Sequence, residues 1–126
     1  MMTDTPDGAV VAMLQALDDA DHDGVIASFD DDAQGIDELT RAWLRGSAQM
    51  RSYIDGILEA TSDVESRLRD VAVTQIGDAA FVTGVLEQDY DLEGERQSVV
   101  APTTFGLRRT DGVWRICLFH SVPIPD

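Results

Sequence analysis

The second half of the chain holds four consecutive segments of strand composition, and this succession limits the possible folds more than any other feature. The segments cover residues 65–76, 79–91, 97–109 and 113–122. Between them lie residues that favour hairpin turns, namely Gly77-Asp78, the Glu93-Gly94 region and Asp111-Gly112. Because connections this short join antiparallel neighbours, the sequence predicts a four-strand antiparallel meander.

The first half of the chain is expected to be mainly helical. Thr5-Pro6-Asp7 is typical of a helix start, with Thr5 as the cap. A short helix is expected over residues 24–30 and an extended segment over 33–37. A third helix is expected from Ser47, another cap candidate, because an apolar stripe follows at helical spacing, formed by Met50, Tyr53, Ile54, Ile57 and Leu58. Helices followed by a meander indicate an α+β fold, and the length suits one domain over residues 1–126.

The charge is strongly negative. Asp and Glu number 24 against 9 basic residues, which gives a formal net charge of −15. Such a surface repels polyanions, so we expect neither a nucleic-acid nor a membrane partner. The single cysteine, Cys117, excludes an internal disulfide and a cysteine-clustered metal site. With neither a leader-like N-terminus nor a long apolar run, we expect a cytoplasmic protein without cofactor or metal.

One stretch imitates a calcium-binding loop. "DADHDGVIASFD", residues 19–30, places acids at the first, third and fifth positions and Gly24 at the sixth. However, the twelfth position is Asp30, whose side chain is short for the bidentate contact, and no helical stripe follows. We therefore interpret the stretch as an acidic turn between two helices.

The same stretch belongs to a broader pattern. Asp23-Gly24 precedes an apolar segment ending at Phe29, "DDDA" follows, and Arg45-Gly46 and "VVAP" at residues 99–102 come later. In this order the chain resembles the nuclear-transport-factor-2-like superfamily, in its SnoaL-like and ketosteroid-isomerase-like branch. The resemblance implies a cone-shaped fold, with three helices packed on a strongly curved antiparallel sheet, an apolar pocket, and dimerisation through the outer sheet face.

The resemblance also implies site residues. Asp37 falls where the isomerases carry their general base, Met13 where they carry a tyrosine, and Thr104 where they carry a protonated aspartate. A thioether cannot donate a hydrogen bond, and losing one such donor typically costs about a hundredfold in rate. The pattern therefore keeps a base at Asp37 with Thr104 as its neighbour, and argues against steroid isomerisation.

The last strand places a potential base, His120, next to a potential nucleophile, Ser121. Because side chains alternate along a strand, His120 and Ser121 point to opposite faces and cannot act together unless a bulge intervenes. The family resemblance implies that the side chains of Cys117, Phe119 and Ser121 point toward the pocket. It implies that those of Trp114, Ile116 and Leu118 point toward a second copy of the chain in a homodimer. His120 would then be an interface residue, with a structural role or one as an acid–base or pH-dependent group.

Further pocket residues follow from the other elements. On the second strand the resemblance implies that Val85, Glu87 and Asp89 point toward the pocket. Glu87 or Asp89 could then transfer protons there. The alternative is that both acids are exposed to solvent and have no catalytic role. The remaining pocket candidates are Trp43, Tyr53 and Ile57.

Two functions remain open at this point. One is a pocket protein that binds a small apolar ligand and is not a steroid isomerase. The other is an acid–base enzyme of isomerase, cyclase, dehydratase or hydrolase type that uses Asp37 as its general base.

Overall fold

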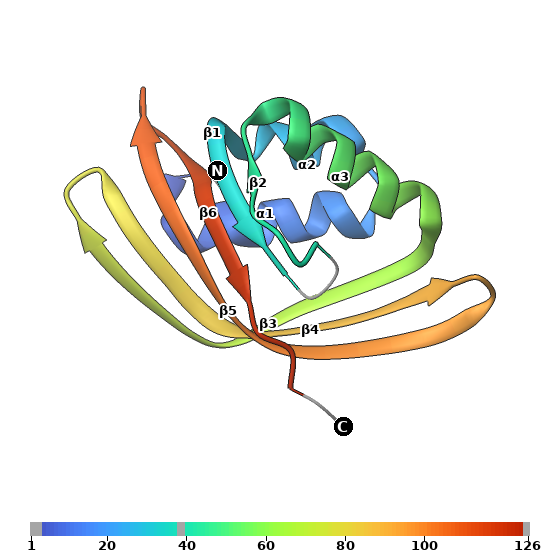
Figure 1. Cartoon of the computed structure of the whole chain (residues 1–126). Helices are drawn as coiled ribbons and strands as arrows, with labels where there is room; N and C mark the ends of the chain where they lie inside the picture. The colour runs from blue at the N-terminus through green and yellow to red at the C-terminus, as the bar shows by residue number, and fades with distance from the viewer. Residues whose placement is uncertain (1–3, 38–39, 125–126) are drawn as a thin grey trace.

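The computed structural model describes residues 4–37 and 40–124. Their order confirms the predicted α+β class: α1 (Pro6–Asp18), α2 (His22–Ala27), β1 (Phe29–Ile36), β2 (Leu44–Arg45), α3 (Ser47–Ala60), β3 (Thr61–Ile76), β4 (Ala79–Leu92), β5 (Glu95–Thr110) and β6 (Val113–Ser121). The four long strands form the predicted meander, and the three helices lie on the concave side of the curved sheet (Figure 1).

The sequence predicts an antiparallel sheet, but the sheet also contains one parallel pair of strands. Its six strands are ordered β2-β1-β6-β5-β4-β3, and β1 runs parallel to β6. Parallel neighbours need a long connection, which α3 and the strands β3 to β5 supply. The short strand β2 pairs antiparallel with β1 and escaped prediction, because its two residues are too few to show an alternation.

Two irregularities bend the long hairpin of β3 and β4. The register between these strands shifts between Ser62 and Glu65 and again between Arg69 and Ala72. Within each shift an aspartate adopts a left-handed conformation, Asp63 with φ 49° and Asp70 with φ 54°. Because an extra residue in one strand of a pair bends that strand and increases its twist, these bulges account for part of the curvature.

The helix starts follow from local hydrogen bonds. Thr5 caps α1 as predicted, since its Oγ1 accepts a hydrogen bond from the Gly8 N–H at 3.1 Å. Helix α3 begins at Ser47 itself and not after it. The residue in the cap position is Gly46, whose φ of 85° is favourable only for glycine.

The acids of the calcium-like stretch serve separate purposes. Asp21 caps α2 through the Gly24 N–H at 3.0 Å, Asp23 pairs with Arg51 of α3, and Asp30 lies in β1, where it pairs with Arg108. Helix α2 occupies the middle of the stretch. The described residues contain no group of three or more His, Cys, Asp and Glu side chains that could hold a metal ion.

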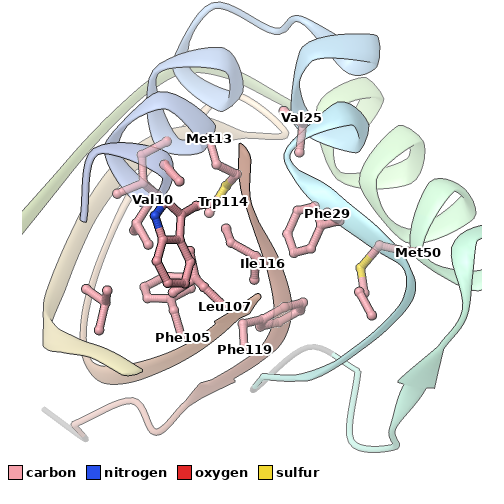
Figure 2. Close-up of a cluster of buried hydrophobic side chains, with 14 of the residues drawn as sticks. Val10, Met13, Val25, Phe29, Met50, Phe105, Leu107, Trp114, Ile116 and Phe119 are labelled. Carbon is pink, nitrogen blue, oxygen red and sulfur yellow. The ribbon is translucent and has the colours of Figure 1, made fainter. Parts of the chain in front are cut away.

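Several of the most deeply buried side chains of the core lie beneath the first half of α1. Val10, Leu107, Trp114 and Ile116 are almost fully buried there, and Trp114 is 2% and Ile116 0% exposed. Figure 2 shows these side chains gathered between α1 and the sheet. We call this group the filled end of the concave side. None of the helices in the described part of the chain has the length and hydropathy needed to span a membrane.

The position of Trp114 and Ile116 corrects the expectation that they face a partner. Residues 107 and 116 are paired, whereas the next pair is 106 with 118, so Cys117 is an extra residue in β6. This bulge reverses the alternation along the strand. Trp114 and Ile116 before the bulge and Phe119 after it therefore all face the concave side, while Leu118 lies on the outer face.

Candidate active or ligand-binding site

A cavity of about 510 Å³ occupies the concave side beneath α3. Most of its wall is apolar, and α1 contributes Met13, Leu14 and Leu17 to it. Helix α3 contributes Tyr53, Ile54 and Ile57, and the sheet contributes Leu86, Ala101, Phe105 and Phe119. We call this region the hollow end. The volume lies in the range of natural small-molecule pockets, which are about 300–1,000 Å³.

Among the described residues, the wall that carries a carboxyl group is formed where β1 ends and α3 passes above it. Asp37 follows β1, and its Oδ1 accepts a hydrogen bond from the Thr40 N–H at 3.1 Å. Its Oδ2 accepts a hydrogen bond from the Tyr53 hydroxyl of α3. Thr40 Oγ1 in turn accepts from the Asp37 N–H at 3.2 Å. The carboxyl group of Asp37 is thus held in one orientation at the cavity wall, where Asp37, Thr40 and Tyr53 all lie.

Aromatic rings continue this wall. The ring of Tyr53 stacks on Phe119 with centroids 6.4 Å apart, and Phe29 meets Phe119 edge to face at 6.0 Å. Phe119 is fixed from its other side by Gly35, its partner in the strand pairing. A Cβ atom at Gly35 would lie 2.0 Å from Cε1 of Phe119, so only glycine leaves room for this ring position.

Further polar groups reach the cavity from the sheet, Gln88 and Ser121 among them. Gln88 lines it, and its Nε2 donates to Ser66 Oγ of β3 at 3.0 Å. Ser121 also lines it, and its hydroxyl shares a 3.0 Å hydrogen bond with the buried hydroxyl of Thr103. Thr103 donates to the Ala101 carbonyl at 2.9 Å. These groups are bound within the wall and give the cavity hydrogen-bonding positions away from Asp37.

Six of the residues predicted from the sequence to face a pocket lie together in the cavity wall: Met13, Asp37, Tyr53, Ile57, Phe119 and Ser121. As expected, His120 and Ser121 point to opposite faces, since Ser121 lines the cavity and His120 is exposed. The bulge at Cys117 does not change this result, because it precedes both residues.

The prediction for β4 was reversed. Val85, Glu87 and Asp89 lie on the outer face, and the inward set is Leu86, Gln88, Tyr90 and Leu92. Arg69 pairs with Glu87 at 3.2 Å and Ser98 donates to Asp89 at 2.6 Å. The buried residues Ala80 and Val82 lie on the same face of β4 as this inward set. The rule that the apolar face of a strand packs on the core therefore predicts the observed orientation.

Three other candidates also lie away from the cavity. Thr104 pairs with Thr83 and His120 on the outer face, and its neighbour Thr103 faces inward. Trp43 is 41% exposed, with its ring 6.1 Å from the His120 ring and the Arg45 guanidinium 5.7 Å away. Cys117 is the bulge residue and is not among the lining residues; partial burial raises the pKa of its thiol.

Sequence reasoning missed Thr40, Gln88 and Tyr90. The opposite assignment of the two faces of β4 would have placed Gln88 and Tyr90 in the cavity wall. Nothing in the sequence marks Thr40, because its role depends on the turn that returns to Asp37.

Comparison with known proteins now places this architecture. The model of the SnoaL-like domain family matches residues 8–125. The chain belongs to the SnoaL-like domain family. A search of curated proteins gave no match. The fold is the nuclear-transport-factor-2-like fold, as the resemblance implied.

Solved structures share the fold of this SnoaL-like domain at low sequence identity. A ketosteroid isomerase-like protein from Erwinia carotovora atroseptica is 23% identical, with a TM-score of 0.82 over 96% of this chain and 95% of that one. An NTF2-like protein of unknown function from Pseudomonas putida is 21% identical, with a TM-score of 0.80 over 95% and 84%. The CaMKII hub from S. rosetta is 19% identical, with a TM-score of 0.76 over 92% and 95%. These likenesses establish architecture and leave the chemistry to the site itself.

Proposed function

We propose that this SnoaL-like domain binds a small, mainly apolar molecule in the hollow end and is not a steroid isomerase. The observation that carries the proposal is the contrast within one concave surface. Buried side chains of Val10, Leu107, Trp114 and Ile116 occupy the filled end, whereas the hollow end retains about 510 Å³ with an apolar wall and a few polar groups. Pockets for small molecules combine these properties.

The residues at the positions of the isomerase donors, and the hydroxyl groups nearest to them, argue against isomerase chemistry. Met13 lies in the wall with a thioether that cannot donate, and Thr104 is outside the cavity. The Tyr53 hydroxyl donates to Asp37 itself, and the Thr103 hydroxyl donates to a backbone carbonyl. Stabilising an enolate oxygen requires donors aimed at that oxygen, and removing one costs about a hundredfold or more in rate.

A specific contact supports the alternative of an acid–base enzyme. A general base works best when its orientation is fixed within reach of the substrate. Asp37 is held by Thr40 and Tyr53 at the cavity wall, and the hydroxyl of Tyr53 lies beside it as a proton donor. If this version holds, Asp37→Asn abolishes turnover while the fold is retained. Unchanged turnover in Asp37→Asn would remove the enzymatic version.

We also propose a homodimer through the outer sheet face. Phe81 is 51% exposed there, and the strand pairing places Val85, Val100 and Leu118 on the same face. The CaMKII hub from S. rosetta shares the fold. Sedimentation of the wild type as a dimer, and of Phe81→Glu as a monomer, is the expected result. A wild-type monomer would contradict this part of the proposal.

Binding is tested with N-phenylnaphthylamine, a neutral apolar dye whose fluorescence rises in apolar surroundings. Gly56 of α3 lines the cavity, and no atom lies within 4 Å of a Cβ built on it. We expect saturable binding to the wild type and to Gly56→Ala, and weakened binding to Gly56→Phe, which fills the space. Equal binding to all three proteins, or none to the wild type, would contradict the proposal.

A further inference from the structure

The charges around the cavity are one-sided. Among the described residues of its wall, Asp37 is the one acidic side chain, and none is Lys, Arg or His. An anionic group on a ligand would therefore enter a largely apolar space with a carboxylate and no cation to pair with it. A like charge in such surroundings is unfavourable, because the low local dielectric strengthens the repulsion.

Asp37 presents its carboxyl group at the cavity wall. Its two oxygens accept from the Thr40 N–H at 3.1 Å and from the Tyr53 hydroxyl. Each carboxylate oxygen has two lone pairs, so a bound ammonium group can donate to the same carboxylate without displacing these partners. Hydrogen bonds between charged partners are about twice as strong as neutral ones.

The rings beside Asp37 also favour positive charge. Phe119 lies between Phe29 and Tyr53, with centroid distances of 6.0 and 6.4 Å. Tyr90 and Phe105 add two more rings to the wall. The faces of aromatic rings attract cations, and the attraction grows when the cation loses its water.

The charge of the whole chain acts in the same direction. The chain carries a formal net charge of −15, so its overall field attracts cations and repels anions. Clefts with apolar walls focus such a field and raise the local concentration of ions of opposite charge.

From these four observations we infer that the cavity selects organic cations, namely amines with an apolar body, and excludes carboxylates of the same size. The ammonium group binds at Asp37 beside Tyr53, and the apolar body lies against Phe119 and the α1 residues. The inference rests on the proposed ligand-binding function, because it specifies which molecules that cavity accepts.

The test uses three probes of one skeleton: phenylbutylamine, phenylbutanol and phenylbutanoate. Each displaces N-phenylnaphthylamine from the full chain at neutral pH and low salt. We expect the amine to bind about ten- to a hundredfold more tightly than the alcohol, the range that a hydrogen bond to a charged group supports. The carboxylate should bind more weakly than the alcohol.

Two variants locate the preference. In Asp37→Asn the amine and the alcohol should bind within about twofold of each other. Asp111→Asn removes one charge from an exposed turn, where the φ of 53° also suits asparagine, and should keep the preference. This pair separates the local carboxylate from the overall charge.

The outcomes distinguish a failure of the cation preference from a failure of ligand binding itself. If the alcohol binds the wild type as tightly as the amine, the selection of cations is wrong while ligand binding stands. If the preference survives Asp37→Asn, Asp37 is not its source and the inference is equally overturned. If neither the dye nor any probe binds, the cavity is no ligand site and both proposals fail. The wild-type series alone decides the inference should Asp37→Asn not fold.

Discussion

The two ends of the concave side differ in what fills them, although both are covered by helices and both are apolar. In the filled end, Trp114 and Ile116 occupy the space beneath α1. In the hollow end, α3 stands above the sheet and the side chains of Tyr53 and Ile57 border a cavity. The fold therefore places a buried core and an open cavity side by side along a single surface. Substitutions in the filled end should change the free energy of unfolding, and those in the hollow end should change affinity.

The largest effect is expected from one substitution made at both ends. Ile116→Ala removes a fully buried side chain, and such truncations cost about 2–5 kcal/mol. Ile57→Ala shortens a half-buried side chain that already borders empty space, so it should cost clearly less. Urea unfolding of both variants measures the difference, and Ile116→Val with Ile57→Val replaces the pair if the first does not fold. Equal losses at the two positions would contradict the separation.

A substitution where Gly35 meets Phe119 should affect both properties. Gly35→Ala places a Cβ atom 2.0 Å from the Phe119 ring, which must move. Overpacking of this kind costs about 1–3 kcal/mol. Because Phe119 forms part of the cavity wall, binding of N-phenylnaphthylamine should weaken as well. Unfolding and dye titration measure the two effects, and a variant with wild-type stability would show that the ring does not depend on Gly35.

Removing one hydroxyl group tests the wall around Asp37. Tyr53→Phe keeps the ring on Phe119 and deletes the donor to the carboxylate. The expected loss of stability is about 1 kcal/mol, typical of one hydrogen bond. Urea unfolding checks this value. A larger loss, comparable with that of Ile116→Ala, would mean that this wall stabilises the fold as the core does and is not specialised as a site.

A small gain is expected at Gly56. Replacing an exposed glycine inside a helix by alanine stabilises it by about 0.5–1 kcal/mol, and no atom obstructs the new methyl group. Thermal unfolding of Gly56→Ala measures the gain. A destabilised variant would mean that the hollow end is more crowded at this point than described.

The reactivity of Cys117, the bulge residue of β6, should depend on pH. Burial raises the pKa of the Cys117 thiol, so less of it is thiolate at any pH below that value. Alkylation by iodoacetamide should therefore be slower in the folded protein than in urea and should accelerate at higher pH. Equal rates in both states would argue against the partial burial of the thiol.

Much of the architecture could be predicted from the sequence because it depends on local patterns. The turns at Gly77, Gly94 and Asp111 define the meander, and Thr5 defines the start of α1. The parallel pairing of β1 and the strand β2 could not be predicted, because neither leaves a periodic signal. The bulge at Cys117 was equally invisible, since an inserted residue looks like any other in an apolar strand.

The candidate site was predictable only in part. Met13, Tyr53 and Ile57 lie in the cavity wall on helices, where one turn of error does not exchange the two faces. On the strands an error of one residue turns every side chain to the other face, which misplaced Thr104 and the set of Val85, Glu87 and Asp89. In β4 the charged residues Glu87 and Asp89 themselves indicate which face is exposed, whereas the family resemblance implied the opposite orientation.

The most direct test is a titration of the isotope-labelled protein with phenylbutylamine, followed by nuclear magnetic resonance. The account predicts saturable shift changes at Tyr53, Ile57, Leu86 and Gln88, with little change at Val85, Glu87 and Thr104 on the outer face. Changes centred on the outer face, or none at the residues of the hollow end, would contradict it.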